Sequence, residues 1–204
     1  ANTVYTVTGT TNGCSSTDAV TVAIDTTRPI ANAGINKIIT CTNPTHVIGT
    51  AATAGNSYAW TPSVGLSNAA IAQPTANKPG NYVLTVTKNA NGCNSSDAVT
   101  VAVDTTQPNA DAGSDVILTC INPTLQIGSV AVAGNTYSWS PALGLDNASI
   151  AQPTANTTGN YTLTVTKLVN GCTITDDVTV AVDTTKPTAN AGADKIITCT
   201  NQTL

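Results

Sequence analysis

Hydrophobic and polar residues alternate with a period of two in two neighbouring runs near the middle of the chain. In the first run, the apolar side chains of one face are those of Tyr82, Leu84 and Val86. In the second run, they are those of Val99, Val101 and Val103. β-Branched residues in such an alternation favour a half-buried pleated strand. The pattern therefore predicts two β-strands that each turn one face towards a core.

A turn signal separates the two runs. Asn91-Gly92 tolerates the positive φ angles that tight hairpin turns require. The same dipeptide recurs as Asn12-Gly13 and Asn170-Gly171, and each copy is followed directly by a cysteine. The chain is therefore expected to contain the same β-hairpin three times.

The hairpin belongs to a repeat of 79 residues. Its cysteines recur at this interval (93 − 14 = 172 − 93 = 79), as do Cys41, Cys120 and Cys199. A regular interval of this length indicates tandem domains. The linker prolines set the frame of four segments: the C-terminal part of one repeat at 1–27, complete repeats at 28–106 and 107–185, and the N-terminal part of the next at 186–204.

Further short strands are expected between the turn residues of each repeat. In the first complete repeat they are placed at 37–41, at 46–50, around Tyr58 and Trp60, and at 71–76, and an edge segment begins at Pro29. Trp60 and its equivalent Trp139 are the expected large core residues. About seven short strands without helical periodicity predict an all-β fold, in which immunoglobulin-like antiparallel β-sandwiches follow one another in a linear array.

Four segments of the first complete repeat carry a family resemblance, namely Ala31-Asn32-Ala33-Gly34, Tyr58-Ala59-Trp60, the run from Gly80 to Thr87, and Val99-Thr100-Val101. They resemble the polycystic-kidney-disease (PKD) type of immunoglobulin-like domain. The paired Thr-Cys and Asn-Gly-Cys elements are similar to repeats of giant surface adhesins of the Bacteroidota, including gliding-motility adhesins exported by type 9 secretion. The chain lacks the Trp-Asp-Phe-Gly-Asp run of better-known PKD domains.

Composition and charge narrow the range of functions. Only 9% of the residues are charged and the net charge is −4, so there is no basic stripe and no nucleic-acid partner is expected. The six cysteines stand at fixed spacing in small modules, which indicates disulfides and an oxidising compartment. We therefore expect an extracellular, cell-surface location, and no membrane span is visible in the sequence.

Two cysteine pairings are open. One lies within the repeats, with the bonds Cys41–Cys93 and Cys120–Cys172. In a sandwich of this topology, however, about ten strand residues, or about 33 Å, separate the end of the first strand from the hairpin cysteine. A disulfide needs Cα atoms within about 7 Å. Geometry therefore favours a bond between repeats, Cys41 with Cys172, and leaves four cysteines to pair outside this window, namely Cys14, Cys93, Cys120 and Cys199.

No residue set points to catalysis or to a cofactor. His46 is the only histidine, and the next repeat has Leu125 in its place, so no ligand role is expected for it. A candidate calcium site consists of Asp104, Asp111 and Asp115, since calcium prefers six or more oxygen ligands. The preceding linker offers one aspartate and two asparagines instead, and no recurring metal site is expected.

The linkers carry the repeated sequence Asp-Thr-Thr. It looks like the O-glycosylation signal of Bacteroidota, and this resemblance implies glycans on Thr26, Thr105 and Thr184. The other interpretation is a strand end followed by a polar linker.

The leading hypothesis for function is structural and not enzymatic. The chain is interpreted as a segment of a long extracellular filament or adhesin stalk, with a mechanical and spacer role stiffened by disulfides. The alternatives are a ligand- or glycan-binding adhesin module and a non-catalytic spacer of a secreted enzyme. The expected partners are neighbouring repeats of the same chain, other copies arranged laterally in a fibre, and surface glycans.

Overall fold

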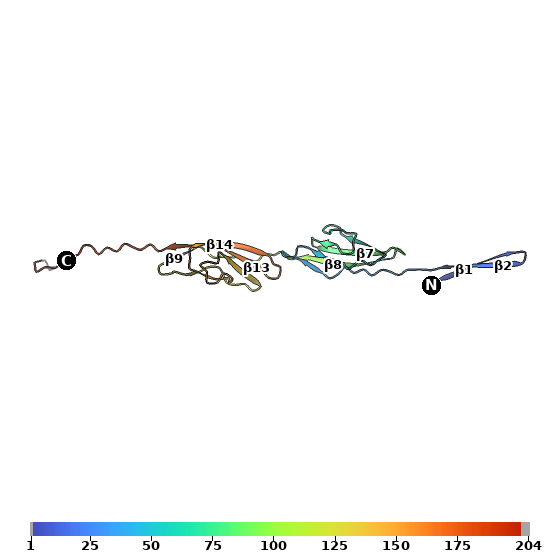
Figure 1. The fold of residues 1–204 in the computed structure, drawn as a ribbon, viewed down its shortest axis with the longest axis horizontal. Helices are drawn as coiled ribbons and strands as arrows, with labels where there is room; N and C mark the ends of the chain where they lie inside the picture. The colour runs from blue at the N-terminus through green and yellow to red at the C-terminus, as the bar shows by residue number, and fades with distance from the viewer. Residues whose placement is uncertain (1, 201–204) are drawn as a thin grey trace. The chain divides into compact units, whose positions relative to one another are not determined.

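A computed structural model describes residues 2–200, all of which lie in strands, turns or irregular segments (Figure 1). The chain divides into two compact units. Unit 1 consists of Ala1–Thr106 together with Val169–Cys172, and unit 2 of Gln107–Leu168 together with Thr173–Leu204. Over the described range there is no helix of the length and apolarity that crossing a membrane requires.

Unit 1 contains a hairpin, a four-stranded sheet and a two-stranded sheet. The hairpin pairs β1 (Thr3–Thr11) with β2 (Cys14–Val22). The larger sheet has the order β3 (Lys37–Ile39), β8 (Asn94–Val103), β7 (Gly80–Lys88) and β5 (Asn56–Thr61). The smaller sheet pairs β4 (His46–Val47) with β6 (Thr75–Ala76).

Unit 2 repeats both sheets in the same order. Its larger sheet has the order β9 (Val116–Thr119), β14 (Thr173–Asp183), β13 (Gly159–Lys167) and β11 (Asn135–Ser140). Its smaller sheet pairs β10 (Leu125–Gln126) with β12 (Thr154–Ala155). The expected all-β class of tandem immunoglobulin-like sandwiches is confirmed.

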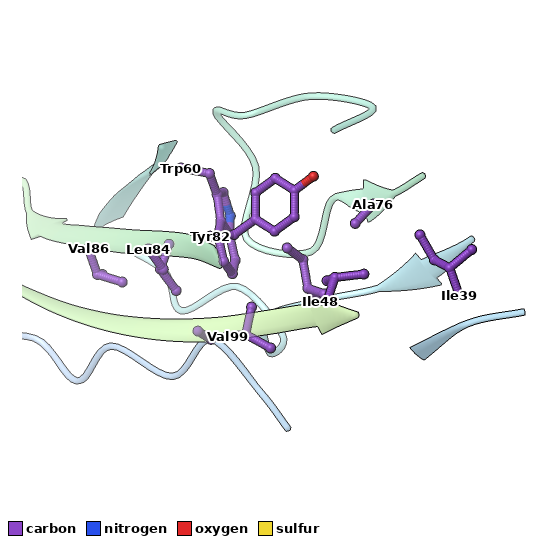
Figure 2. Packing of buried hydrophobic residues seen from close by; sticks show 10 residues of the cluster. Ile39, Ile48, Trp60, Ala76, Tyr82, Leu84, Val86 and Val99 are labelled. Atoms are coloured by element: carbon purple, nitrogen blue, oxygen red, sulfur yellow. The ribbon is translucent and has the colours of Figure 1, made fainter. Parts of the chain in front are cut away.

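A tryptophan lies at the centre of each core. Figure 2 shows Trp60 beside Tyr82, with Leu84 and Ile48 nearby. Trp60 is 3% exposed, and its indole N–H donates to the carbonyl oxygen of Ile71 at 3.0 Å. A Cβ on Gly49, which has φ +81°, would lie 2.9 Å from the indole and 2.1 Å from a backbone oxygen, so only glycine fits beneath the ring. Trp139 and Gly128 repeat this arrangement in unit 2.

The predicted alternation of buried and exposed residues is confirmed over most of β7 and β8. The buried side chains are those of Tyr82, Leu84, Val86, Val99 and Val101. Val103, expected on the same face, is 50% exposed. The cause is the register: the first residue of β7, Gly80, pairs with Val101, so the end of β8 extends past β7.

Other details differ from the expected sandwich. Each repeat has six assigned strands, the segment after Pro29 forms none of them, and β4 and β6 are two residues long. One strand pair is not antiparallel: β3 runs parallel to β8, as β9 does to β14. A parallel pair needs a long crossover connection, which the intervening strands supply.

The Asn-Gly signal leads to two different turns. Asn12 and Gly13 close a two-residue turn with φ angles of 49° and 78°, as predicted. At Asn91-Gly92 the prediction of a tight turn is wrong. The last residue pair of the two strands is Thr87 with Asn94, and a wider loop joins these residues. The carbonyl oxygen of Lys88 accepts hydrogen bonds from the backbone N–H groups of Asn91 at 3.3 Å and Gly92 at 2.8 Å.

Candidate functional site: the linker clamps and the disulfide

The wider β7–β8 turn frees the side chain of Asn91 to hold the linker that precedes the repeat. Its Nδ2 donates to the carbonyl oxygens of Asp25 at 3.3 Å and Thr27 at 3.0 Å. Its Oδ1 accepts from the backbone N–H of Cys93 at 3.0 Å. We call the contacts of Asn91 and Lys88 with Asp25–Thr27 the first clamp. One amide thus fixes both the turn and the linker.

The carboxylate of Asp25 organises the linker side of the first clamp. It accepts hydrogen bonds from the hydroxyl and the backbone N–H of Thr27, the latter at 3.0 Å. Lys88 Nζ lies 2.9 Å from the Asp25 carboxylate and 3.0 Å from the Thr27 hydroxyl. These bonds, led by that of the Thr27 hydroxyl and followed by that of Lys88, hold the pKa of Asp25 well below its ordinary range.

The lowered pKa predicts that acid loosens the first clamp. Because the folded-state pKa of Asp25 is depressed, its stabilising contribution is complete above the ordinary pKa of 3.8 and is lost as the pH falls through the folded-state pKa. The pair is exposed, so we expect a local change and little effect on global stability.

Amide NMR between pH 6 and pH 1 measures this change, because a carboxylate with a depressed pKa stays ionised well below its ordinary value. The resonances of the Asn91 side chain should shift on acidification, and Asp25→Asn should abolish the part of that shift which follows the carboxylate. Acid titration that leaves the Asn91 amide unchanged in the wild-type chain contradicts the prediction.

The second clamp consists of the contacts of Asn170 with Asp104 and Thr106, all of which belong to unit 1. Asn170 is 2% exposed, and its Nδ2 donates to the carbonyl oxygen of Thr106 at 2.9 Å and to Asp104 Oδ1 at 3.0 Å. Its Oδ1 accepts from the backbone N–H of Cys172 at 3.0 Å. A buried amide must be hydrogen bonded: the linker accepts from the Nδ2 of Asn170, and the backbone N–H of Cys172 donates to its Oδ1.

A disulfide lies beside the second clamp. It joins Cys41 to Cys172, whose Cα atoms are 5.1 Å apart, and Cys172 is fully buried. The structure thus contains the pair that geometry favoured. The within-repeat bonds Cys41–Cys93 and Cys120–Cys172 are absent from the structure. Each of them would need a sulfur atom that the Cys41–Cys172 bond already uses.

Strand length explains why the within-repeat bond does not form. Cys93 follows the first clamp, whereas Cys41 is bonded beside the second. The ten residues of β8 run between the two clamps and span roughly 33 Å, several times the reach of a disulfide.

Gly171 marks the place where the turn meets Thr42. A Cβ on Gly171 would lie 2.2 Å from the Thr42 methyl group, whereas nothing lies within 4 Å of a Cβ on Gly92. Both glycines have positive φ, of 67° and 73°, so an alanine is strained equally at the two sites. The difference between the two alanine variants therefore isolates the contact with Thr42.

We expect Gly171→Ala to weaken the second clamp more than Gly92→Ala weakens the first. Hydrogen exchange at the backbone N–H of Cys172 should increase in Gly171→Ala. In Gly92→Ala, exchange at the equivalent N–H of Cys93 should show only the smaller increase that comes from backbone strain. Equal effects of the two substitutions would mean that the Thr42 contact contributes nothing.

The residues of the calcium candidate have separate partners. Asp111 accepts from the N–H of Gly113 at 3.0 Å, and Asp115 accepts from the N–H of Thr179 at 2.8 Å. Asp104 is part of the second clamp. Within residues 2–200, no group of three or more histidine, cysteine or acidic side chains is placed to hold a metal.

The other predicted site residues lie mostly at the surface. Of the cysteines outside the disulfide, Cys93 is half-buried, and three are exposed: Cys14, Cys120 and Cys199. The middle threonine of each linker is exposed, and these are Thr26, Thr105 and Thr184. His46 Nε2 lies 2.7 Å from the carbonyl oxygen of Ile38.

The clamp asparagines are the functional residues that sequence reasoning missed. The sequence predicts only a turn at these positions, because Asn-Gly is a strong local signal. A second signal was present in the sequence: Asn12, Asn91 and Asn170 recur at the same interval as the Asp-Thr-Thr linkers.

Comparisons with known proteins give similarity of fold only. No family model and no curated protein matches the chain. Among solved structures, extracellular domains 3–5 of Drosophila OTK are 15% identical with a TM-score of 0.42, and the match covers 74% of this chain and 60% of that one. The I-band fragment I67–I69 of titin is 10% identical with a TM-score of 0.39, covering 89% and 75%. Immunoglobulin domains 1–4 of Sidekick-1 are 11% identical with a TM-score of 0.28, covering 89% and 66%.

Proposed function

We propose that this chain is a structural segment of a long extracellular filament or adhesin stalk. The observation that carries the proposal is the disulfide between Cys41 and Cys172, which links residues of successive repeats beside an asparagine clamp. The clamp recurs at the linker of Asp25–Thr27, so the same device serves more than one junction. A tandem array gains stability from such contacts between neighbouring repeats.

The disulfide and the family resemblance support an extracellular location. Disulfides persist in oxidising compartments, which supports an extracellular location and a place at the cell surface. The resemblance to Bacteroidota adhesins of the type 9 secretion and gliding-motility kind supports the same placement. By the 79-residue period, Cys93 and Cys120 would form the same bond with cysteines of adjoining repeats.

Linker glycosylation is part of this proposal. In the linkers of Asp25 and Asp104, the third residue donates its hydroxyl and N–H groups to the aspartate. The middle threonine is exposed, which leaves Thr26, Thr105 and Thr184 as acceptor sites for glycans. An intact mass equal to that of the bare polypeptide in material from the native source would exclude the modification.

Imaging of the native assembly tests the proposed stalk. Beads at a constant axial repeat are expected, whereas isolated globules would contradict it. A binding adhesin would be expected to vary its loops between copies, but here the loop sequence Asn-Pro-Thr recurs unchanged at residues 43–45 and 122–124. This favours the structural role over ligand or glycan binding.

A further inference from the structure

The disulfide closes a large covalent loop within the chain. Cys41 and Cys172 are 131 residues apart in sequence, and their Cα atoms are 5.1 Å apart. Residues 42–171 lie inside this loop, and they include every strand from β4 to β13. Both core tryptophans, Trp60 and Trp139, are therefore inside it.

We propose that the Cys41–Cys172 bond is a tension bypass, which carries a pulling force past the two sandwich cores. A force on a chain follows its covalent bonds, and from Cys41 it passes through the disulfide directly to Cys172. The peptide between these two cysteines cannot be drawn out while the bond is intact. Unfolding of either core under tension then releases no length from residues 42–171. This inference deepens the proposed stalk function.

The segment that receives the force after Cys172 has little length to yield. It is β14, which begins at Thr173 and continues for eleven residues. A strand rises about 3.3 Å per residue, and a fully extended chain reaches at most about 3.3–3.6 Å per residue. β14 is thus already close to its maximum length in the folded state. The strands paired with it, β9 and β13, lie inside the covalent loop.

The same type of segment recurs on the other side of the bond. From Cys14 to Cys41 there are 27 residues (41 − 14), and from Cys172 to Cys199 there are also 27 (199 − 172). Each segment begins at a hairpin cysteine and ends at the next Thr-Cys element. The first contains β2 and β3, and the second contains β14. The strand that leaves the hairpin and its linker therefore serve as the tension member of the repeat.

The second clamp places the bond where this path requires it. Asn170 holds Thr106 and Asp104, and it also accepts from the backbone N–H of Cys172. Cys172 is thereby fixed beside the linker that leaves the first complete repeat. The hydrogen bonds position Cys172, and the covalent bond then carries the force.

Single-molecule stretching of this chain by its two ends tests the inference. In the oxidised protein we expect extension only from residues outside the loop. A thiol reductant converts the disulfide to two thiols as the reductant is oxidised, and the loop should then add about 430–470 Å, from 131 residues at 3.3–3.6 Å each. Cys120→Ser should behave as the wild type does, whereas Cys41→Ser/Cys172→Ser should yield the full length without reductant.

Two results would overturn the inference. Within-repeat pairing would lock two loops of 52 residues (93 − 41 = 172 − 120), each released as a step of about 170–190 Å. An oxidised chain that extends fully without reductant would show that no bond carries the force. Neither result depends on whether the native assembly is a filament, which imaging decides separately.

Discussion

Replacing Cys41 and Cys172 together by serine is expected to lower the free energy of unfolding by about 5 kcal/mol. The bond closes a loop with a sequence separation of 131 residues, and the loop-entropy model gives about this value for a loop of that size. The loss arises mainly in the unfolded chain, which the bond no longer confines. Guanidinium unfolding followed by tryptophan fluorescence reports the effect, because Trp60 and Trp139 both lie inside the loop.

The cysteines outside the observed bond provide the matched control. Cys120→Ser removes an exposed thiol and should leave the unfolding midpoint unchanged. Reduction of the wild-type protein should reproduce the double serine variant. A double variant as stable as the wild type would mean that the bond does not constrain the unfolded chain, and equal losses in Cys120→Ser and the double variant would point to a different pairing.

The hairpins and the cores could be predicted because their signals are local. Alternation in β7 and β8 identifies the buried face, and each tryptophan stands in the strand that its neighbours predict. The two-residue strands β4 and β6 are shorter than their apolar runs suggested. Their pairing depends on contacts with distant segments, which local propensity does not report.

The clamps show where local sequence reasoning ends. Asn12-Gly13 forms the tight turn that the dipeptide favours, but Asn91-Gly92 does not. The Asn91 amide instead bonds to Asp25 and Thr27, which are more than 60 residues away in sequence. The wider turn thus occurs together with a tertiary contact that the local turn preference does not report. The disulfide, by contrast, could be chosen from strand length alone, since ten residues of β8 exceed its reach.

Trp60→Ala is expected to destabilise unit 1 by about 3–5 kcal/mol, the usual cost of deleting a large buried aromatic side chain. The ring packs on Gly49 and is 3% exposed, so its removal leaves a cavity. The carbonyl oxygen of Ile71 would also lose the indole N–H that binds it at 3.0 Å. A loss of this size is a large part of the stability of a small domain.

Hydrogen exchange of separate strands distinguishes this effect from a change in the whole chain. Trp60→Ala should accelerate exchange in Gly80–Lys88 and leave Gly159–Lys167 nearly unchanged, and Trp139→Ala should do the reverse. Tyr5→Ala serves as the control, because Tyr5 is 59% exposed and should change neither strand. If Trp60→Ala left both strands protected, the tryptophan could not be the centre of the core.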